Sequence, residues 1–296
     1  MITMLLSKNL KEELIKFIFF ILAAVSIFIV FFIIYFLFVE SIPAFQEYGL
    51  GIFEANWSVP REVYKIGAAL FGTAIVTIGA MIIAIPLGLI SAIFLSEIAP
   101  YHLRTLLKPV IELLAGIPSI VYGFLGATLL VQFLQPTFGL LKGISLLAGS
   151  LILGIMALPI IISISDDALK AVPRNLKEAS LALGATKWET IKKVTFPTAI
   201  SGISAAVIMG MGRAVGETMA VSLVVGNIMQ IPIPPFDIFE SGATLTSIIA
   251  LEMGESTGIQ TYSLFACGVI LFIIVGTMSV VSNLLKERVE RKYRGG

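Results

Sequence analysis

Apolar residues dominate the chain in six long runs that are separated by polar segments. Each run holds about 20 residues or more, which is the length that an α-helix needs to cross the hydrocarbon core of a bilayer. Because the runs are continuous and not alternating, they predict membrane-spanning helices. The predicted spans cover residues 15–39, 67–95, 109–134, 144–165, 198–229 and 262–285.

The longest charged interval between two of these runs covers residues 166–197, and we call it the polar hairpin. Pro173 favours the start of a short helix, and Gly184 favours its end. Thr186 followed by Glu189 is a capping-box pattern, which favours the start of a second helix. The pattern therefore predicts two ordered helices at the membrane surface, placed to contact another molecule. The basic residues of this interval are Lys170, Arg174, Lys177, Lys187, Lys192 and Lys193.

The composition supports a membrane protein. Hydrophobic residues make up 57% of the chain and charged residues 13%, whereas roughly a quarter of the residues in a soluble domain are charged. The single cysteine, Cys267, lies in an apolar run, and the single histidine, His102, cannot form a metal site alone. We expect no disulfide within the chain, no metal and no cofactor. The first apolar run is longer than the core of a signal peptide, and we interpret it as an uncleaved anchor.

Lysine and arginine are unevenly distributed between the two sides of the predicted membrane domain. With the N-terminus inside, and with Lys16 counted with the N-terminal tail, 16 of the 20 basic residues lie in inside segments, three lie in outside segments, and Arg213 lies within a span. Because cytoplasmic segments are enriched in these residues, both termini and the polar hairpin are predicted to be cytoplasmic, in a protein of the cytoplasmic membrane. The predicted organisation is a tail at 1–14, a membrane domain at 15–285 and a basic tail at 286–296.

The predicted outer loop, residues 230–261, contains an apolar stretch at 244–251 that is too short to span a bilayer. This stretch predicts a re-entrant or interfacial helix, or a helix that packs over the outer mouth. A functional lid and a plain structural cap both fit the sequence.

Two charges, Arg213 and Glu217, lie in the fifth span and are followed by Thr218. A charge inside a bilayer is costly, so it normally faces the protein interior or a cavity. The spacing of four places both charges on one helical face, which fits either an internal ion pair or a polar element of a substrate path. An arginine fork matches a tetrahedral oxyanion. A carboxylate can accept a hydrogen bond from a protonated anion, which favours phosphate over sulfate.

Other features of the spans have more than one interpretation. Gly212 and Gly216 form a GxxxG pattern, and small residues at 202, 206 and 210 continue the spacing. Such a stripe favours close helix packing, either within the chain or against a partner. Glu112, near one end of the third span, is expected to reach the headgroups or to pair with Lys108.

The polar hairpin carries a more specific pattern, which is Glu178-Ala179-Ser180, then Gly184, and then an aliphatic and aromatic segment that ends at Pro197. This pattern resembles the EAA loop of ABC-importer permeases, and it departs from that loop at Ser180, where the family has alanine. In that family the loop forms helices that dock onto a cytoplasmic ATPase. Small residues permit close approach, and the glycine permits a sharp turn.

Further segments narrow the resemblance. GRAVGETMAV at 212–221, the following VGN at 225–227 and AGIPSIVYG at 115–123 are similar to the PstC-type permeases of phosphate ABC importers. The resemblance extends over about residues 15–285. It implies an all-helical type I ABC-importer permease that forms a heterodimer with a PstA-like permease in the lipid bilayer.

The same resemblance implies two copies of a PstB-like ATPase, a PstS-like binding protein that delivers phosphate, and no nucleic acid. It also implies that Arg213, Glu217 and Thr218 belong to the substrate path. The sequence lacks a GK dipeptide, and so lacks the phosphate-cradling loop of an ATPase, which argues against an enzyme. Two alternatives remain open: a permease of this architecture for molybdate or sulfate, and a channel or secondary carrier that does not use ATP.

Overall fold

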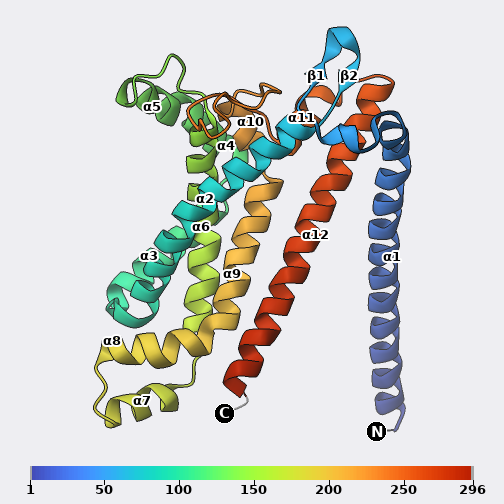
Figure 1. Ribbon diagram of the computed structural model, residues 1–296. Helices are drawn as coiled ribbons and strands as arrows, with labels where there is room; N and C mark the ends of the chain where they lie inside the picture. The colour runs from blue at the N-terminus through green and yellow to red at the C-terminus, as the bar shows by residue number, and fades with distance from the viewer. Residues whose placement is uncertain (1, 295–296) are drawn as a thin grey trace.

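The computed structural model describes residues 2–294, and it describes side-chain surroundings for residues 12–281 and Leu284. Most side chains of the predicted tails, 1–14 and 286–296, therefore lie outside the described residues. Helices account for nearly all of the regular structure (Figure 1). A two-stranded antiparallel ribbon, β1 (Trp57–Ser58) and β2 (Val63–Tyr64), pairs Trp57 with Tyr64.

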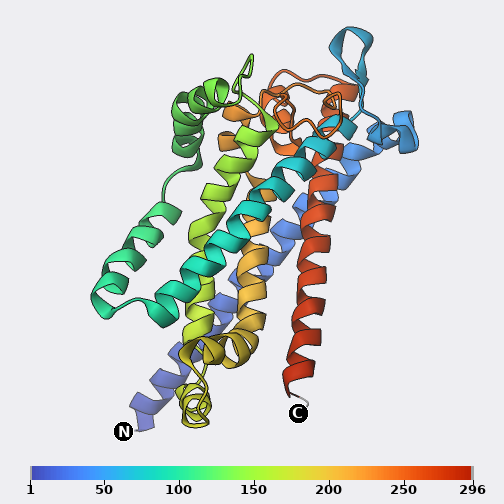
Figure 2. The same ribbon diagram turned by 60° about the vertical axis from the view of Figure 1, so that its left-hand side comes forward.

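In the part of the chain that the structure describes, six helical segments are long and apolar enough to cross a membrane, as the sequence predicts. They cover Glu12–Phe53, Gly67–Ile98, Ser119–Thr137, Leu146–Lys170, Lys187–Gly216 and Ile259–Val281. The helices that form the long spans are α1 (Ile2–Tyr48), α2 (Gly67–Ile93), α6 (Leu146–Lys170), α9 (Phe196–Gly216) and α12 (Ile259–Arg294). One end of α1, one end of α12 and the polar hairpin lie at the same end of the molecule (Figures 1 and 2).

Helix α6 occupies the centre of the fold and packs against both α2 and α9. In its most apolar window 61% of the residues are buried, whereas the corresponding window of α1 has none. Small residues make this packing close, because a Cβ added to Gly202 or Gly210 would press against Ala168 or Ile161 of α6. This part of the small-residue stripe therefore packs within the chain.

Helix α1 stands apart from the central bundle and packs against α12, from which it diverges toward the two chain termini (Figure 1). Phe36 of α1 meets Phe265 of α12 edge to face, with 5.6 Å between ring centroids. The other large apolar side chains of α1 are mostly exposed in the isolated chain. Exposure of this extent is unfavourable in water and favourable in lipid, so α1 depends on the bilayer as its solvent.

The prediction of one continuous third span at 109–134 is wrong. The region divides into α3 (Tyr101–Ala115) and a second helical segment, Ser119–Thr137, with a break at residues 116–118. Pro118 has no backbone N–H and disfavours helical geometry at the residue before it. The second segment comprises α4 (Ser119–Leu125), a π-helical stretch and α5 (Val131–Thr137).

The predicted fifth span, 198–229, also ends early. Helix α9 stops at Gly216, Glu217 is extended, and a short helix α10 (Met219–Val224) follows. The outer loop then contains α11 (Leu245–Glu252), whose capping box is formed by Thr244 and Ser247.

Candidate functional site

The two interrupted spans meet, and we call the region where α4 packs against α10 the junction. A Cβ added to Gly123 of α4 would lie 2.8 Å from the Cα of Ala220 in α10. This distance is too short for a real side chain, so glycine is what permits the two backbones to approach. The motifs at 115–123 and 212–221, which stand almost 100 residues apart in the sequence, thus form one structural unit.

Tyr122 bridges the break in the third span. Its hydroxyl donates a hydrogen bond to the carbonyl oxygen of Leu114 at 2.8 Å, which ties α4 back to the last turn of α3. The Arg213 guanidinium lies within electrostatic reach of this phenol. The basic residue that the sequence singles out is therefore close to the break in a different span.

Glu217 occupies the break that follows α9, and its carboxylate is buried. One carboxylate oxygen accepts hydrogen bonds from the backbone N–H groups of Thr218 at 3.2 Å and Ala220 at 3.4 Å. Its backbone carbonyl accepts a hydrogen bond from the Thr246 hydroxyl at 2.7 Å. Glu217 thus organises the start of α10 and the contact of this turn with α11.

The prediction that Arg213 and Glu217 share one helical face is wrong. The helix ends at Gly216, and Glu217 has extended backbone angles, so the spacing of four no longer aligns the two side chains. Within the described part of the chain, no salt bridge includes Arg213. The interpretation of the two charges as an internal ion pair therefore fails, and Arg213 carries a charge that the carboxylate does not neutralise.

The surroundings of Arg213 are less crowded than the rest of α9. A Cβ added to Gly212 or Gly216 would have no neighbouring atom within 4 Å, unlike one added to Gly202 or Gly210. The Thr218 hydroxyl donates to the carbonyl oxygen of Gly216 at 3.3 Å. The stripe of small residues therefore divides into a half that packs on α6 and a half that borders open space beside Arg213.

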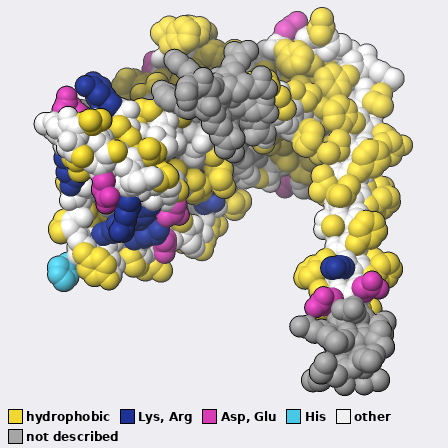
Figure 3. Space-filling view, turned by 90° about the horizontal axis from the view of Figure 1, so that it is seen from below, with side chains coloured by type: hydrophobic (Ala, Val, Ile, Leu, Met, Phe, Trp, Pro, Cys, Tyr) yellow, Lys and Arg dark blue, Asp and Glu magenta, His cyan; other side chains and the backbone are white. Residues whose placement is uncertain are grey.

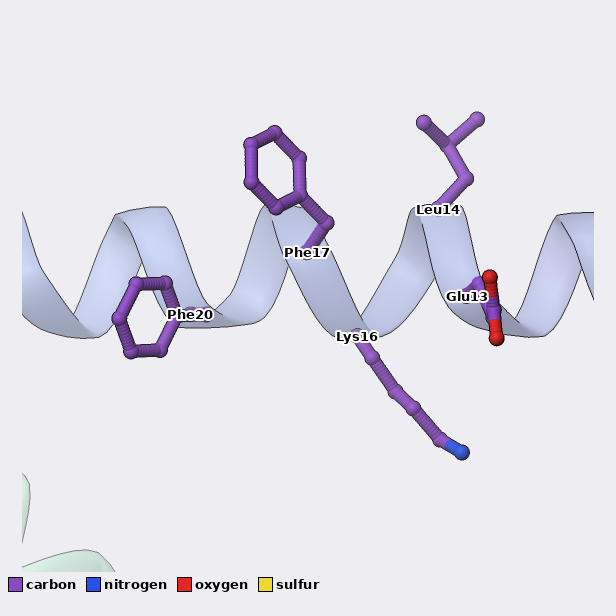
Figure 4. Close-up of a pocket in the computed structure, with 5 residues that line it drawn as sticks. All are labelled: Glu13, Leu14, Lys16, Phe17 and Phe20. Atoms are coloured by element: carbon purple, nitrogen blue, oxygen red, sulfur yellow. The ribbon is translucent and has the colours of Figure 1, made fainter.

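A groove of about 580 Å³ on α1 is unrelated to this site. Its lining residues all lie on one short stretch of α1, and their side chains point in different directions from a single helix (Figure 4). Such a groove has no opposing wall from another element, so we do not regard it as a binding site.

The polar hairpin forms the two short helices that the sequence predicts. Helix α7 (Arg174–Ala182) begins after Pro173, and Gly184 has the left-handed φ of +86° that favours glycine. Helix α8 (Lys187–Thr190) begins with the predicted capping box, in which the Thr186 hydroxyl accepts from the Glu189 N–H at 3.2 Å. A π-helical turn then leads into α9, where Pro197 lies in the first turn.

The hairpin presents mixed chemistry at the surface. Glu178 and Ala179 are exposed, and so are two large apolar side chains, Leu183 at 89% and Trp188 at 61%. Figure 3 looks onto this end of the molecule and shows basic, acidic and hydrophobic side chains gathered there. Exposed apolar side chains beside charged ones are typical of a surface that binds another protein.

Several contacts of the hairpin end were not predicted. The hydroxyls of Ser180 and Thr190 lie 3.0 Å apart and join the two helices of the hairpin. Lys177 Nζ lies 2.6 Å from Glu97 Oε1, at the end of the second span. Residues so far apart in sequence show no periodic signal, so only the folded chain reveals this pair.

Of the two interpretations of Glu112, the pairing with Lys108 is wrong. Lys108 Nζ instead lies 2.7 Å from Asp167 Oδ1 and 3.6 Å from Asp166 Oδ2, and Glu112 is exposed. The hydrogen bond to Asp167 raises the pKa of Lys108 above its ordinary value. The contact joins α3 to the last turns of α6, which local spacing within α3 cannot predict.

Comparison with known proteins places these features in a family. The model of the family described as "Binding-protein-dependent transport system inner membrane component" matches residues 84–295. A probable ABC transporter permease protein, YqgH of Bacillus subtilis, is 42% identical over 86% of this chain and 84% of its own length. The phosphate transport system permease protein PstC of Pasteurella multocida is 36% identical over 93% and 89%.

A solved structure shares the fold. A chain in the crystal structure of a bacterial alginate ABC transporter, in complex with an alginate pentasaccharide-bound periplasmic protein, superposes with a TM-score of 0.62. The match covers 92% of this chain and 95% of that one, at 15% identity. The likeness therefore concerns the arrangement of helices and not the substrate.

Proposed function

The chain belongs to the family of binding-protein-dependent transport system inner membrane components, and from that premise we propose that it is a permease subunit of an ATP-driven phosphate importer. Its fold is that of the type I ABC-importer permeases. The PstC proteins of several organisms, similar along most of their length, support phosphate as the substrate. One structural observation carries the proposal. Arg213 lies near two helix breaks, and no carboxylate of the described residues neutralises its charge.

Arg213 is the group that we propose to contact phosphate during its passage. A guanidinium has a rigid fork of donors that matches two oxygens of a tetrahedral anion. Because Arg213 has no carboxylate partner in the described structure, an anion would not have to displace an internal ion pair. Thr218 adds a hydroxyl near this path.

Glu217 has a different role in this proposal from the one that its charge first suggests. Its carboxylate already accepts two backbone hydrogen bonds, so it positions the turn that follows α9. The preference for phosphate over sulfate therefore rests on the relatives, because an arginine fork fits both anions and the Glu217 carboxylate is already engaged.

The polar hairpin is the segment that we propose to dock onto the ATPase. Glu178, Ala179 and Ser180 lie on α7, and Gly184 forms the turn beside the exposed Leu183. Docking would remove this leucine and Trp188 from water, which contributes favourable binding free energy. This arrangement implies that the hairpin and both termini are cytoplasmic.

The partners that we propose are those that the PstC-like relatives imply. A PstA-like permease would complete the path and cover apolar surface such as the groove of about 390 Å³ between α9 and α12. Two copies of a PstB-like ATPase would bind below, and a PstS-like protein would deliver phosphate at the opposite end. ATP hydrolysis would then take place in a separate polypeptide.

Transport measurements separate this proposal from its alternatives. The chain is reconstituted in vesicles with its partner permease and ATPase, with binding protein on one side and ATP on the other. Uptake of labelled phosphate that needs ATP and binding protein, and that sulfate and molybdate do not inhibit, is the expected result. Uptake without ATP would indicate a channel or carrier. ATP-driven uptake of molybdate or sulfate would keep the architecture and change the substrate.

A further inference from the structure

Helix α2 connects the two functional regions, because one end meets the polar hairpin and the other meets the outer loop beside Glu217. The π-helical turn Phe94–Ile98 extends α2 toward the hairpin and carries Glu97. At the opposite end, the first turns of α2 carry Gly72 and Thr73. Together with this turn, α2 forms one helical segment, Gly67–Ile98, that is long enough to cross a membrane and so links the two ends.

The inner contact is a partly buried ion pair. Lys177 Nζ of α7 lies 2.6 Å from Glu97 Oε1, and the two side chains are 21% and 11% exposed. The same ammonium group donates to the carbonyl oxygen of Leu169 at 3.3 Å, and Ser96 donates to Glu97 at 3.1 Å. One lysine of the hairpin is thus held by the ends of both α2 and α6, which restricts independent movement of α7.

The outer contact is between α2 and the loop backbone that leads into α11. A Cβ added to Gly72 would collide with the carbonyl oxygen of Ala243, so the loop backbone rests directly on α2. One residue on, the buried Thr73 hydroxyl accepts the backbone N–H of Leu245 at 2.9 Å. This N–H is in the first turn of α11 and has no partner within that helix. Helix α11 is therefore attached to α2 by a specific contact.

Helix α11 in turn contacts the turn at Glu217. The Thr246 hydroxyl donates to the backbone carbonyl of Glu217 at 2.7 Å, and both residues are buried. Glu217 in turn organises the start of α10, which packs against α4 at the junction. Hydrogen bonds thus lead from α2 through α11 to the turn that follows Arg213.

We propose that α2 is the lever that couples the ATPase-binding hairpin to the substrate path, with Lys177–Glu97 as its inner joint and the Gly72–Thr73 seat of α11 as its outer joint. The proposal rests on the proposed function, because it assigns the direction in which the ATPase acts on the path. Glu97, Lys177, Thr73 and Thr246 are then positioning residues, which act through α2 and Glu217 without contacting phosphate.

The assembled importer in vesicles tests the inner joint through two rates, phosphate uptake and ATP hydrolysis. For Glu97→Gln and Lys177→Met we expect ATP hydrolysis to continue. The amount of phosphate taken up per ATP should fall by about 2- to 30-fold, which is the effect expected when one contact in a coupling network is lost. The exchange Glu97→Lys with Lys177→Glu restores the pair and is expected to recover most of the ratio. Wild-type ratios in the single variants, or no recovery in the exchange, would overturn the proposal.

A matched control and a variant at the outer joint show where the coupling ratio is determined. Glu54→Gln removes an ion pair of the same 2.6 Å length, Lys65–Glu54, that lies in the segment between α1 and α2, and we expect it to leave the ratio unchanged. Thr246→Val removes the hydroxyl at the outer joint and is expected to lower the ratio in the same way as Glu97→Gln. An unchanged ratio for Thr246→Val would overturn the outer half of the lever.

A second measurement does not depend on the substrate. Spin labels at Leu251→Cys on α11 and Met219→Cys on α10, in a Cys267→Ser background, report the distance between α11 and the turn that follows α9. We expect ATP binding to change this distance in the wild-type assembly and not in Glu97→Gln. A change that persists in Glu97→Gln would overturn the lever. Absence of phosphate uptake by the wild type would instead reject the proposed function.

Discussion

The polar hairpin is held together by contacts between residues that are close in sequence, whereas the junction is held together by contacts between residues that are far apart. In the hairpin, the Thr186 cap reaches three residues ahead, and Ser180 meets Thr190 ten residues later. At the junction, Gly123 lies against Ala220, and Thr246 bonds to Glu217. A locally folded hairpin can move as one unit. The geometry of the junction, in contrast, changes when any of the helices that form it moves.

This difference bears on how each region would work. A hairpin that keeps its shape can dock onto a partner without paying much ordering entropy. A turn whose hydrogen bonds come from α10 and α11 changes when either helix moves. The hairpin is therefore suited to receive a force, and the junction is suited to change its geometry in response. The four predictions below test this contrast, from the largest expected effect to the smallest.

The largest effect is expected at the junction from Arg213→Ala. The variant removes a cation near the two breaks, and ATP-dependent phosphate uptake is expected to fall to the background rate while the complex still assembles. Arg213→Lys keeps the charge without the fork and should recover only part of the activity. Uptake is measured in vesicles and assembly by size-exclusion chromatography. Normal phosphate flux in Arg213→Ala would remove the residue from the substrate path.

A bulky residue in the hairpin turn is expected to separate ATP hydrolysis from transport. Gly184 has a φ of +86°, which a β-branched residue adopts only with strain, so Gly184→Val would change the direction in which the two hairpin helices run. We expect uptake per ATP to fall while hydrolysis continues. The ratio of the two rates checks this, with Gly184→Asn, which tolerates the left-handed region, as the milder control. Equal coupling in all three proteins would contradict the hairpin as the coupling element.

Close packing at the junction is expected to make Gly123→Ala destabilising. The added Cβ would lie 2.8 Å from the Cα of Ala220, and overpacking of this kind costs about 1–3 kcal/mol. The matched control is Gly276→Ala in α12, where an added Cβ meets no atom within 4 Å. We expect a lower thermal midpoint for the first variant and not for the second, measured on the purified complex. Equal midpoints would mean that α4 and α10 separate easily.

The smallest effect is expected from Ser180→Ala in the hairpin. The change removes the 3.0 Å contact with Thr190, and a hydrogen bond of this kind contributes about 1 kcal/mol. Faster hydrogen exchange of the α7 amides, with uptake close to that of the wild type, is the expected result. Thr190→Val should give the same increase, because it removes the other hydroxyl. Different responses of the two variants would show that the hydroxyls do not act as a pair.

The sequence was sufficient wherever an interaction is local or compositional. The six apolar spans follow from length and hydropathy. The start and end of the hairpin helices follow from Pro173, Gly184 and the capping box at Thr186. The resemblance of the hairpin and the fifth span to phosphate permeases agrees with the relatives that the chain matches. Each of these signals lies within a short window, and its physical cause acts over one or two helical turns.

The wrong predictions for the third and fifth spans share one cause, because each extends a helix through a position where the folded chain turns. The third span breaks at residues 116–118 and the fifth at Gly216, so Arg213 and Glu217 are not on one face. A glycine or proline within a span is compatible with a helix, a kink or a break, and neighbouring helices select among them by supplying hydrogen bonds. Tyr122 and Leu114 form a hydrogen bond across the first break, and Thr246, from a distant segment of the chain, forms one with the residue at the second break.

What the sequence alone determined is that this chain crosses a membrane six times and carries a capped helical hairpin, because hydropathy and capping act between neighbours. Only the tertiary structure decided which residues meet. It joined Gly123 to Ala220 and connected Glu97 to Lys177, and among the residues whose side chains are described it left Arg213 without a carboxylate partner. Contacts between distant residues depend on how whole helices pack, and packing is a property of the complete set of surfaces rather than of any one segment.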